Sequence, residues 1–143
     1  MGKTDRRAVV TAAGAAIVAL AVPRTATAFE EAQRSFIAEA ARMKREAVAS
    51  GDQPFGAVVV KDGVIIGYGP SRVILDHNPN AHAERIALLD AQRRHGINAT
   101  IGAEIYSTSR PCLACENTLA VENVARMYVG ADGADAGRPQ RSR

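Results

Sequence analysis

A tight hairpin of two apolar strands, followed by alternating helical and extended segments, most constrains how this chain can fold. Residues 55–60 are an apolar run rich in β-branched side chains, and residues 64–68 resume the run after Asp62-Gly63. An Asp-Gly pair between two such runs is typical of a two-residue β-hairpin turn. The chain is therefore expected to contain at least one antiparallel strand pair.

Helical and extended patterns alternate on both sides of this hairpin. Phe36, Ala40, Met43 and Ala47 recur at helical spacing in the segment that precedes it. Strands separated by helices favour parallel neighbours with crossover connections. The order α-β-β-α-β-α-β therefore predicts an α/β fold with a mixed sheet of four or more strands and helices on both faces. The expected helices cover about residues 30–50, 82–95 and 111–123, and the further strands cover 103–107 and 126–130.

The first 28 residues have the layout of an export signal. Basic residues precede an apolar stretch from Ala8 to Val22, and Ala26-Thr27-Ala28 forms a small-x-small cleavage site. The pair Arg6-Arg7 before a weakly apolar, Ala-rich stretch is similar to a twin-arginine signal. We therefore expect export to the periplasm or extracellular space, with no stable membrane span after cleavage. An uncleaved membrane anchor is the alternative, although a spanning helix needs about 20 apolar residues.

The basic charge of the chain is concentrated in this leader. The 143 residues include 18 Lys and Arg against 15 Asp and Glu, and residues 1–28 hold four of the basic residues and one of the acidic ones. Removing them leaves 14 of each in the remaining chain. Affinity for nucleic acid depends on Lys and Arg at phosphates and on aromatic stacking, and the chain has only three Phe, three Tyr and no Trp. Nucleic acid is therefore an unfavoured partner.

The sequence divides into three parts by composition. Residues 1–28 form the export signal, residues 29–130 form the folded domain, and residues 131–143 are rich in Gly, Ala, Asp, Pro and Arg. The last segment is expected to be a flexible, disordered tail.

Both cysteines of the chain lie in the sequence Pro111-Cys112-Leu113-Ala114-Cys115, at the expected start of a helix, and His82 lies at the start of the preceding one. One imidazole and two thiolates make three protein ligands of the kind that zinc prefers, with one position open. Three ligands are typical of a catalytic zinc that holds a water molecule. A redox dithiol and a structural pair of buried thiols are the alternatives for the cysteines.

Glu84 follows His82 by two residues and adds a group that can move protons. Hydrolysis of an amino group on a ring transfers one proton away from the water and others to the ring nitrogen and the departing amine. A single carboxylate beside the water can perform these transfers. Alternatively, Glu84 is a first-turn glutamate that only complements the helix dipole.

The spacing His-x-Glu with Pro-Cys-x-x-Cys resembles the signature of the zinc deaminases of nucleobases. Together with residues 54–60 and 80–84, it resembles the guanine deaminase and tRNA adenosine deaminase branch of the cytidine deaminase-like superfamily, over about residues 30–130. The resemblance implies a three-layer α/β/α domain that binds one zinc per chain. The implied roles are zinc ligation by His82, Cys112 and Cys115, proton transfer by Glu84, substrate binding by the Ala83 N–H, a pocket wall at Phe55, and assistance to proton transfer by Asp135. Phe55 could equally be a core residue of its strand.

Three features depart from the family pattern. Ser71 stands where relatives have an Asn that binds the base, so the resemblance implies that Ser71 contacts the substrate, although with a shorter side chain. Arg110 stands where this branch usually has Glu. The sequence also ends about a dozen residues after the last expected strand, where relatives usually add further elements. These departures leave the identity of the base open and leave room for a site completed by a partner subunit or for impaired activity.

The sequence therefore predicts zinc-dependent hydrolytic deamination of a free nucleobase or nucleoside, of guanine or of cytosine and cytidine type. In this mechanism a zinc-bound hydroxide attacks the amino-bearing ring carbon and ammonia is released. Deamination of adenosine in tRNA and a non-catalytic zinc-binding role are the alternatives. The resemblance also implies a homodimer.

Overall fold

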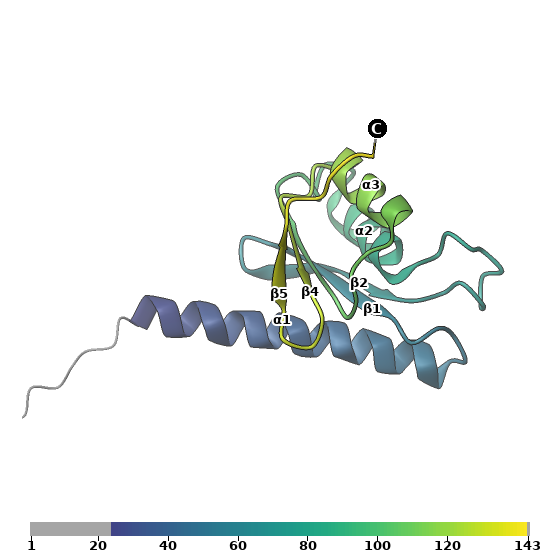
Figure 1. The fold of residues 1–143 in the computed structure, drawn as a ribbon, viewed down its shortest axis with the longest axis horizontal. Helices are drawn as coiled ribbons and strands as arrows, with labels where there is room; N and C mark the ends of the chain where they lie inside the picture. The colour runs from purple at the N-terminus through teal and green to yellow at the C-terminus, as the bar shows by residue number, and fades with distance from the viewer. Residues whose placement is uncertain (1–23, 143) are drawn as a thin grey trace, which may run out of the picture.

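The computed structural model describes residues 24–142 and contains three helices and five strands (Figure 1). The order of helices and strands agrees with the prediction, apart from an additional strand at the C-terminus. The elements are α1 (Arg24–Ala49), β1 (Gly56–Lys61), β2 (Val64–Pro70), α2 (Ala83–His95), β3 (Glu104–Ser107), α3 (Leu113–Val121), β4 (Arg126–Val129) and β5 (Ala134–Gly137).

The expected leader lies mostly outside the described residues, which begin with α1 at Arg24. The expected cleavage position after Ala28 therefore falls inside the first turns of this helix. None of the helices in the described part of the chain combines the length and the apolar composition that crossing a membrane requires.

The five strands form one mixed sheet in the order β2-β1-β3-β4-β5. β1 is antiparallel to both β2 and β3, whereas β3 and β4 run parallel and are connected through α3. The predicted crossover between parallel neighbours is thus found at β3 and β4. β2 and β3 are also joined through a helix, but β1 lies between them. The mixed α/β class is confirmed.

The alternation of side chains along β1 divides the core into two layers. Ala57 and Val59 pack against α2, in a cluster that also contains residues of β3 and β4. Val58 and Val60 point to the opposite face, where they pack with Phe36 and other residues of α1. Figure 1 shows α1 lying across one face of the sheet, with α2 and α3 on the other. The result is the three-layer arrangement that the resemblance implied.

Two glycines in β2 allow α2 to lie directly on the backbone of the sheet. A Cβ atom at Gly67 would lie 2.3 Å from the Ala87 carbonyl oxygen, and one at Gly69 would lie 2.1 Å from that of Ala83. Both distances are far shorter than a van der Waals contact, so a larger residue would push the helix away. The start of α2, where His82 and Glu84 lie, is thereby held close to the sheet.

The composition of residues 131–143 predicts a disordered tail, and this prediction is wrong for most of the segment. Residues 134–137 form β5, which pairs antiparallel with β4. Farther along, Pro139 is buried, and the amide of Asn117 on α3 both donates to the Ser142 hydroxyl (2.7 Å) and accepts from its backbone N–H (2.6 Å). The segment is ordered by partners distant in sequence, which its own composition does not reveal.

Candidate metal and catalytic site

Two helix starts meet at the end of the sheet where β3 finishes. His82 and Cys112 are the N-cap residues of α2 and α3, and both have extended backbone angles. The backbone N–H of Cys115, in the first turn of α3, points to the Cys112 sulfur at 3.4 Å. Helix starts carry a partial positive charge, so they favour thiolates and a carboxylate at this position.

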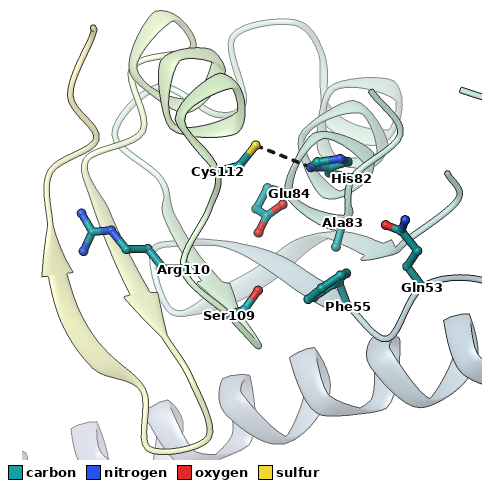
Figure 2. A pocket seen from close by; sticks show the side chains of 8 residues that line it. All are labelled: Gln53, Phe55, His82, Ala83, Glu84, Ser109, Arg110 and Cys112. Carbon is teal, nitrogen blue, oxygen red and sulfur yellow. Dashed lines mark hydrogen bonds between the residues drawn. The ribbon is translucent and has the colours of Figure 1, made fainter. Parts of the chain in front are cut away.

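The three predicted ligands form one cluster. Among the described residues, the ligand atoms of His82, Cys112 and Cys115 all lie within 4.8 Å of one another. The His82 Nδ1 atom lies 3.6 Å from the Cys112 sulfur (dashed line in Figure 2) and 3.4 Å from the Cys115 sulfur. Tetrahedral zinc with ordinary Zn–S and Zn–N bond lengths would separate sulfur and nitrogen ligands by about 3.6 Å. The residues therefore fit a zinc ion with three protein ligands and one open position.

Without a cation this arrangement would disfavour the thiolate of Cys115. Burial raises the pKa of its thiol, and the nearby Glu84 carboxylate and Cys112 raise it further. A divalent cation between the two sulfurs would reverse this preference, because a coordinated thiol loses its proton. Without a metal, the surroundings of Cys115 therefore favour its protonated thiol, and metal binding would displace that proton.

Glu84 is a buried carboxylate with a single side-chain partner in the described structure. Its side chain lies in the first turn of α2, and the residue is only 5% exposed. The Ser107 hydroxyl at the end of β3 donates a hydrogen bond of 2.7 Å to Glu84 Oε1. The sequence analysis does not identify Ser107 as a site residue. The polar side chain at the end of β3, before the cysteine motif, is the only sequence signal that could indicate it.

A cavity of about 130 Å³ opens beside Glu84 and the ligand cluster. The structure places Phe55, which is 39% exposed, and Ala83 in its lining, so Phe55 is not a core residue of its strand. Figure 2 shows these side chains around the opening. The lining is Gln53, Phe55, His82, Ala83, Glu84, Ser109, Arg110 and Cys112.

Three polar side chains of the lining, Gln53, Ser109 and Arg110, are here called the rim residues. Within the described residues none of the three side chains has a hydrogen bond, and Arg110 has only a 3.8 Å ion pair with Glu116. The Arg110 side chain is 63% exposed, and in Figure 2 its guanidinium turns away from Glu84. The sequence analysis identifies the charge of Arg110 as a departure from the family but not the positions of Gln53 and Ser109.

Ser71 does not line this cavity, contrary to the expectation from its position in the family pattern. It is 1% exposed, and its hydroxyl donates a 2.9 Å hydrogen bond to the carboxylate of Asp52. A serine side chain is too short to extend past this partner, so the hydroxyl serves the packing of the loop and not a ligand.

Asp135 is also absent from the lining. It lies on the edge strand β5, where its carboxylate forms a 2.8 Å ion pair with Arg126 and accepts a hydrogen bond from the Gly137 N–H. Arg126 begins β4, whereas the cavity lies where β3 and β4 end. The implied role of Asp135 in proton transfer is therefore not supported by this chain's geometry.

Comparison with known proteins identifies relatives that share most of this region. The family model of the cytidine and deoxycytidylate deaminase zinc-binding region matches residues 30–131. The tRNA-specific adenosine deaminase of Aquifex aeolicus (strain VF5) is 33% identical over 96 residues, which are 67% of this chain and 64% of the relative. The guanine deaminase of Bacillus subtilis (strain 168) is 32% identical over 103 residues, or 71% and 66%. This chain thus spans slightly less than two thirds of either relative.

Solved structures similar to this chain come from the same two kinds of enzyme. A structure from a study of tRNA:A34 deaminases superposes with a TM-score of 0.64 at 30% identity, over 67% of this chain and 70% of that chain. The crystal structure of Bacillus subtilis guanine deaminase superposes with a TM-score of 0.61 at 30% identity, over 67% and 62%. Similarity to the two enzymes is nearly equal, so it does not decide between their substrates.

Proposed function

The chain belongs to the cytidine and deoxycytidylate deaminase zinc-binding family, and we propose that it removes an amino group hydrolytically from a free nucleobase or nucleoside. The observation that carries this proposal is the position of the Glu84 carboxylate, buried beside three zinc ligands in the lining of a small cavity. A proton-transfer group, a metal site and room for a ring system are the three parts that this reaction needs.

In the proposed reaction water adds to the amino-bearing ring carbon, the C–N bond breaks, and one ammonia is released without oxidation or reduction. Zinc, held by His82, Cys112 and Cys115, would supply the positive charge that makes a water molecule acidic near neutral pH. The zinc ligands His82 and Cys112 also line the cavity, which brings the metal site to the substrate.

Glu84 would transfer the protons of this reaction. Its carboxylate takes a proton from the water and delivers protons to the ring nitrogen and to the leaving amine. The hydrogen bond from Ser107 occupies Oε1 and leaves Oε2 available for these transfers. As the first residue of α2, Ala83 has a backbone N–H without a partner in an earlier turn, and this N–H can hold an acceptor atom of the base.

The test is a panel of bases and nucleosides, including guanine, cytosine, cytidine and adenosine, assayed for ammonia release by the purified chain of known zinc content. We expect release from at least one member and a loss of about 100-fold or more in the variant Glu84→Gln, with zinc content unchanged. The amide keeps the shape of the carboxylate but cannot take up the proton. Zinc-loaded protein that releases ammonia from no member of the panel would contradict the proposal.

Adenosine in tRNA is the second candidate substrate, because two of the relatives described above act on tRNA. An anticodon stem-loop with adenosine at the wobble position is the appropriate substrate for this candidate. Deamination of the stem-loop but not of free bases would replace the first proposal with this one. Retention of the zinc site without either activity would support the non-catalytic alternative.

We also propose that the chain forms a homodimer. Leu89 of α2, and Leu113 and Val121 of α3, are between 45% and 65% exposed on the helical layer beside the metal site. Burying these side chains against a second copy would remove apolar area from water. Sedimentation equilibrium should therefore give twice the chain mass, and Val121→Glu should shift the population to monomer.

Export remains a proposal that rests on the leader sequence. Replacement of Arg6-Arg7 by Lys-Lys should retain the protein in the cytoplasm if the twin-arginine route carries it. Cell fractionation of both forms provides the measurement, and unchanged distribution would contradict this route.

A further inference from the structure

Two loops near the cavity, residues 50–55 after α1 and residues 71–75 after β2, are held together by one buried carboxylate. Asp52, which follows α1, accepts hydrogen bonds from the Ser71 hydroxyl and from the backbone N–H groups of Ile74 and Leu75, each at 2.9 Å. It also accepts a 2.7 Å hydrogen bond from the Gln53 N–H. Ser71, at the family position for a base-binding amide, is thus fully used in holding the loop. The Ser71 hydroxyl is therefore not available to a substrate, and the side chains that line the cavity are the ones that can select it.

Gln53 is placed to take over this recognition. Hydrogen bonds fix its backbone on both sides. The Gln53 N–H donates to Asp52, and the Gln53 carbonyl accepts a 2.8 Å hydrogen bond from the Phe55 N–H. Its side chain lines the cavity, and within the described part of the chain its carboxamide has no hydrogen-bond partner. In Figure 2 the Gln53 side chain lies beside Phe55 and Ala83, on the side of the pocket opposite Ser109.

A carboxamide carries a donor and an acceptor side by side, and it pairs best with a ring edge that does the same. Guanine has such an edge in its N1–H and C6 carbonyl, and free cytosine has one in its N1–H and C2 carbonyl. With the amino group turned to the metal, the base of adenosine offers only ring-nitrogen acceptors, and the base of cytidine offers only acceptors because the ribose replaces the N1 hydrogen. With adenosine or cytidine, the amide oxygen of Gln53 therefore finds no donor on the base and stays unpaired.

We propose that Gln53 is the specificity-determining residue of this site, and that its carboxamide selects substrates with a lactam edge, namely guanine and free cytosine, over adenosine and cytidine. This inference rests on the proposed function, because it assumes that the cavity holds a base with its amino group at the metal. It also explains how the site can lack the family's base-binding amide and still distinguish bases.

The test compares Gln53→Leu, which removes both hydrogen-bonding groups, with Gln53→Glu, which removes the donor and leaves a side chain that only accepts. Gln140→Leu is the matched control, because the Gln140 side chain is exposed and bonds only to the Arg138 carbonyl. For Gln53→Leu, we expect kcat/KM for guanine and cytosine to fall roughly ten- to a hundredfold, mainly through KM. For adenosine and cytidine we expect a change below about threefold. Zinc content should be unchanged in all three variants.

Two outcomes would overturn the inference while leaving the proposed function intact. One is an equal loss for all four substrates, and the other is no loss for guanine and cytosine. If the wild-type chain releases no ammonia at all, the proposed function fails separately. Equilibrium binding of guanine to the zinc-loaded protein then decides the inference: weaker binding by Gln53→Leu than by wild type supports it, and equal or undetectable binding by both overturns it.

Discussion

Polar side chains at the ligand cluster differ from the rim residues in how they are held. His82, Cys112 and Cys115 contact one another, and Glu84 is buried and bonded to Ser107. The rim residues line the same cavity without hydrogen bonds among the described residues. In the proposed reaction, the groups for the chemical step are thus held by partners within the protein, whereas the side chains of Gln53 and Ser109 remain available to a substrate. Variants can test whether reaction and selection are separable in this way.

The largest effect is expected for Cys115→Ser, because this residue is buried and supplies one of three metal ligands. A serine hydroxyl is a poor substitute for a thiolate on zinc. The variant should lose stoichiometric zinc and lose more than about 100-fold in deaminase activity. Atomic absorption and ammonia release are the measurements. A variant that keeps one zinc per chain would show that the cluster is not the metal site.

The next largest effect is expected for Ser107→Ala, which removes the hydrogen bond that orients Glu84. We expect kcat to fall by about 10- to 100-fold with little change in KM, as for other residues that support a catalytic group. Ser50→Ala is the control, since it removes a hydroxyl hydrogen bond at the end of α1 and Ser50 does not line the cavity. A change in KM alone would instead indicate that Ser107 affects substrate binding and not the orientation of Glu84.

Asp52→Asn should loosen the loop that carries Gln53 without affecting the ligand cluster. Burial raises the pKa of Asp52, but the hydrogen bonds from Leu75, Gln53, Ser71 and Ile74 outweigh burial and bring the pKa below its ordinary value. The carboxylate therefore stabilises the fold above its unfolded pKa of about 4, and this contribution is lost as the pH falls through the lower folded pKa.

The expected loss of unfolding free energy at pH 7 is about 2 to 3 kcal/mol. Urea unfolding of wild type and variant should show a constant difference from about pH 5 to pH 7 that shrinks below about pH 4. Zinc content at neutral pH should stay the same. A difference that persists undiminished in acid would argue against a role for the charge of Asp52.

The smallest effect is expected for Asp135→Ala. Its ion pair with Arg126 joins two side chains that are each about half exposed, and such pairs contribute little because water screens them. Stability should change by less than about 1 kcal/mol and deamination should be unaffected. A large loss of activity would mean that Asp135 reaches a catalytic site after all, for example that of a second copy.

The parts of the site that the sequence analysis identifies are those carried by local patterns. His82, Glu84, Cys112 and Cys115 lie at helix starts, and a helix start can be recognised from the strand and loop that precede it. Histidine and cysteine are typical zinc ligands and glutamate is a typical proton-transfer group, so the metal could be predicted before the geometry was known. The mixed sheet followed in the same way from hairpin and crossover patterns.

Other parts depended on contacts between segments far apart in the chain. Ser71 was expected to contact the substrate, but its hydroxyl donates a hydrogen bond to Asp52, which lies 19 residues earlier in the chain. Ser107 reaches Glu84 across 23 residues. β5 exists because the edge of β4 offers hydrogen bonds to a segment whose composition suggests disorder. No periodicity or spacing encodes such pairings.

The sequence by itself determined the order of the helices and strands up to β4, the family and the zinc ligand set, because each depends on residue types at short, fixed spacing. Only the tertiary structure decided which polar groups remain available to a substrate. The side chains of Ser71 and Asp135 are occupied by partners, whereas the Gln53 carboxamide has none among the described residues. A hydrogen-bonding group can bind a ligand only if the fold has left it unpaired, and that is settled by packing between distant segments.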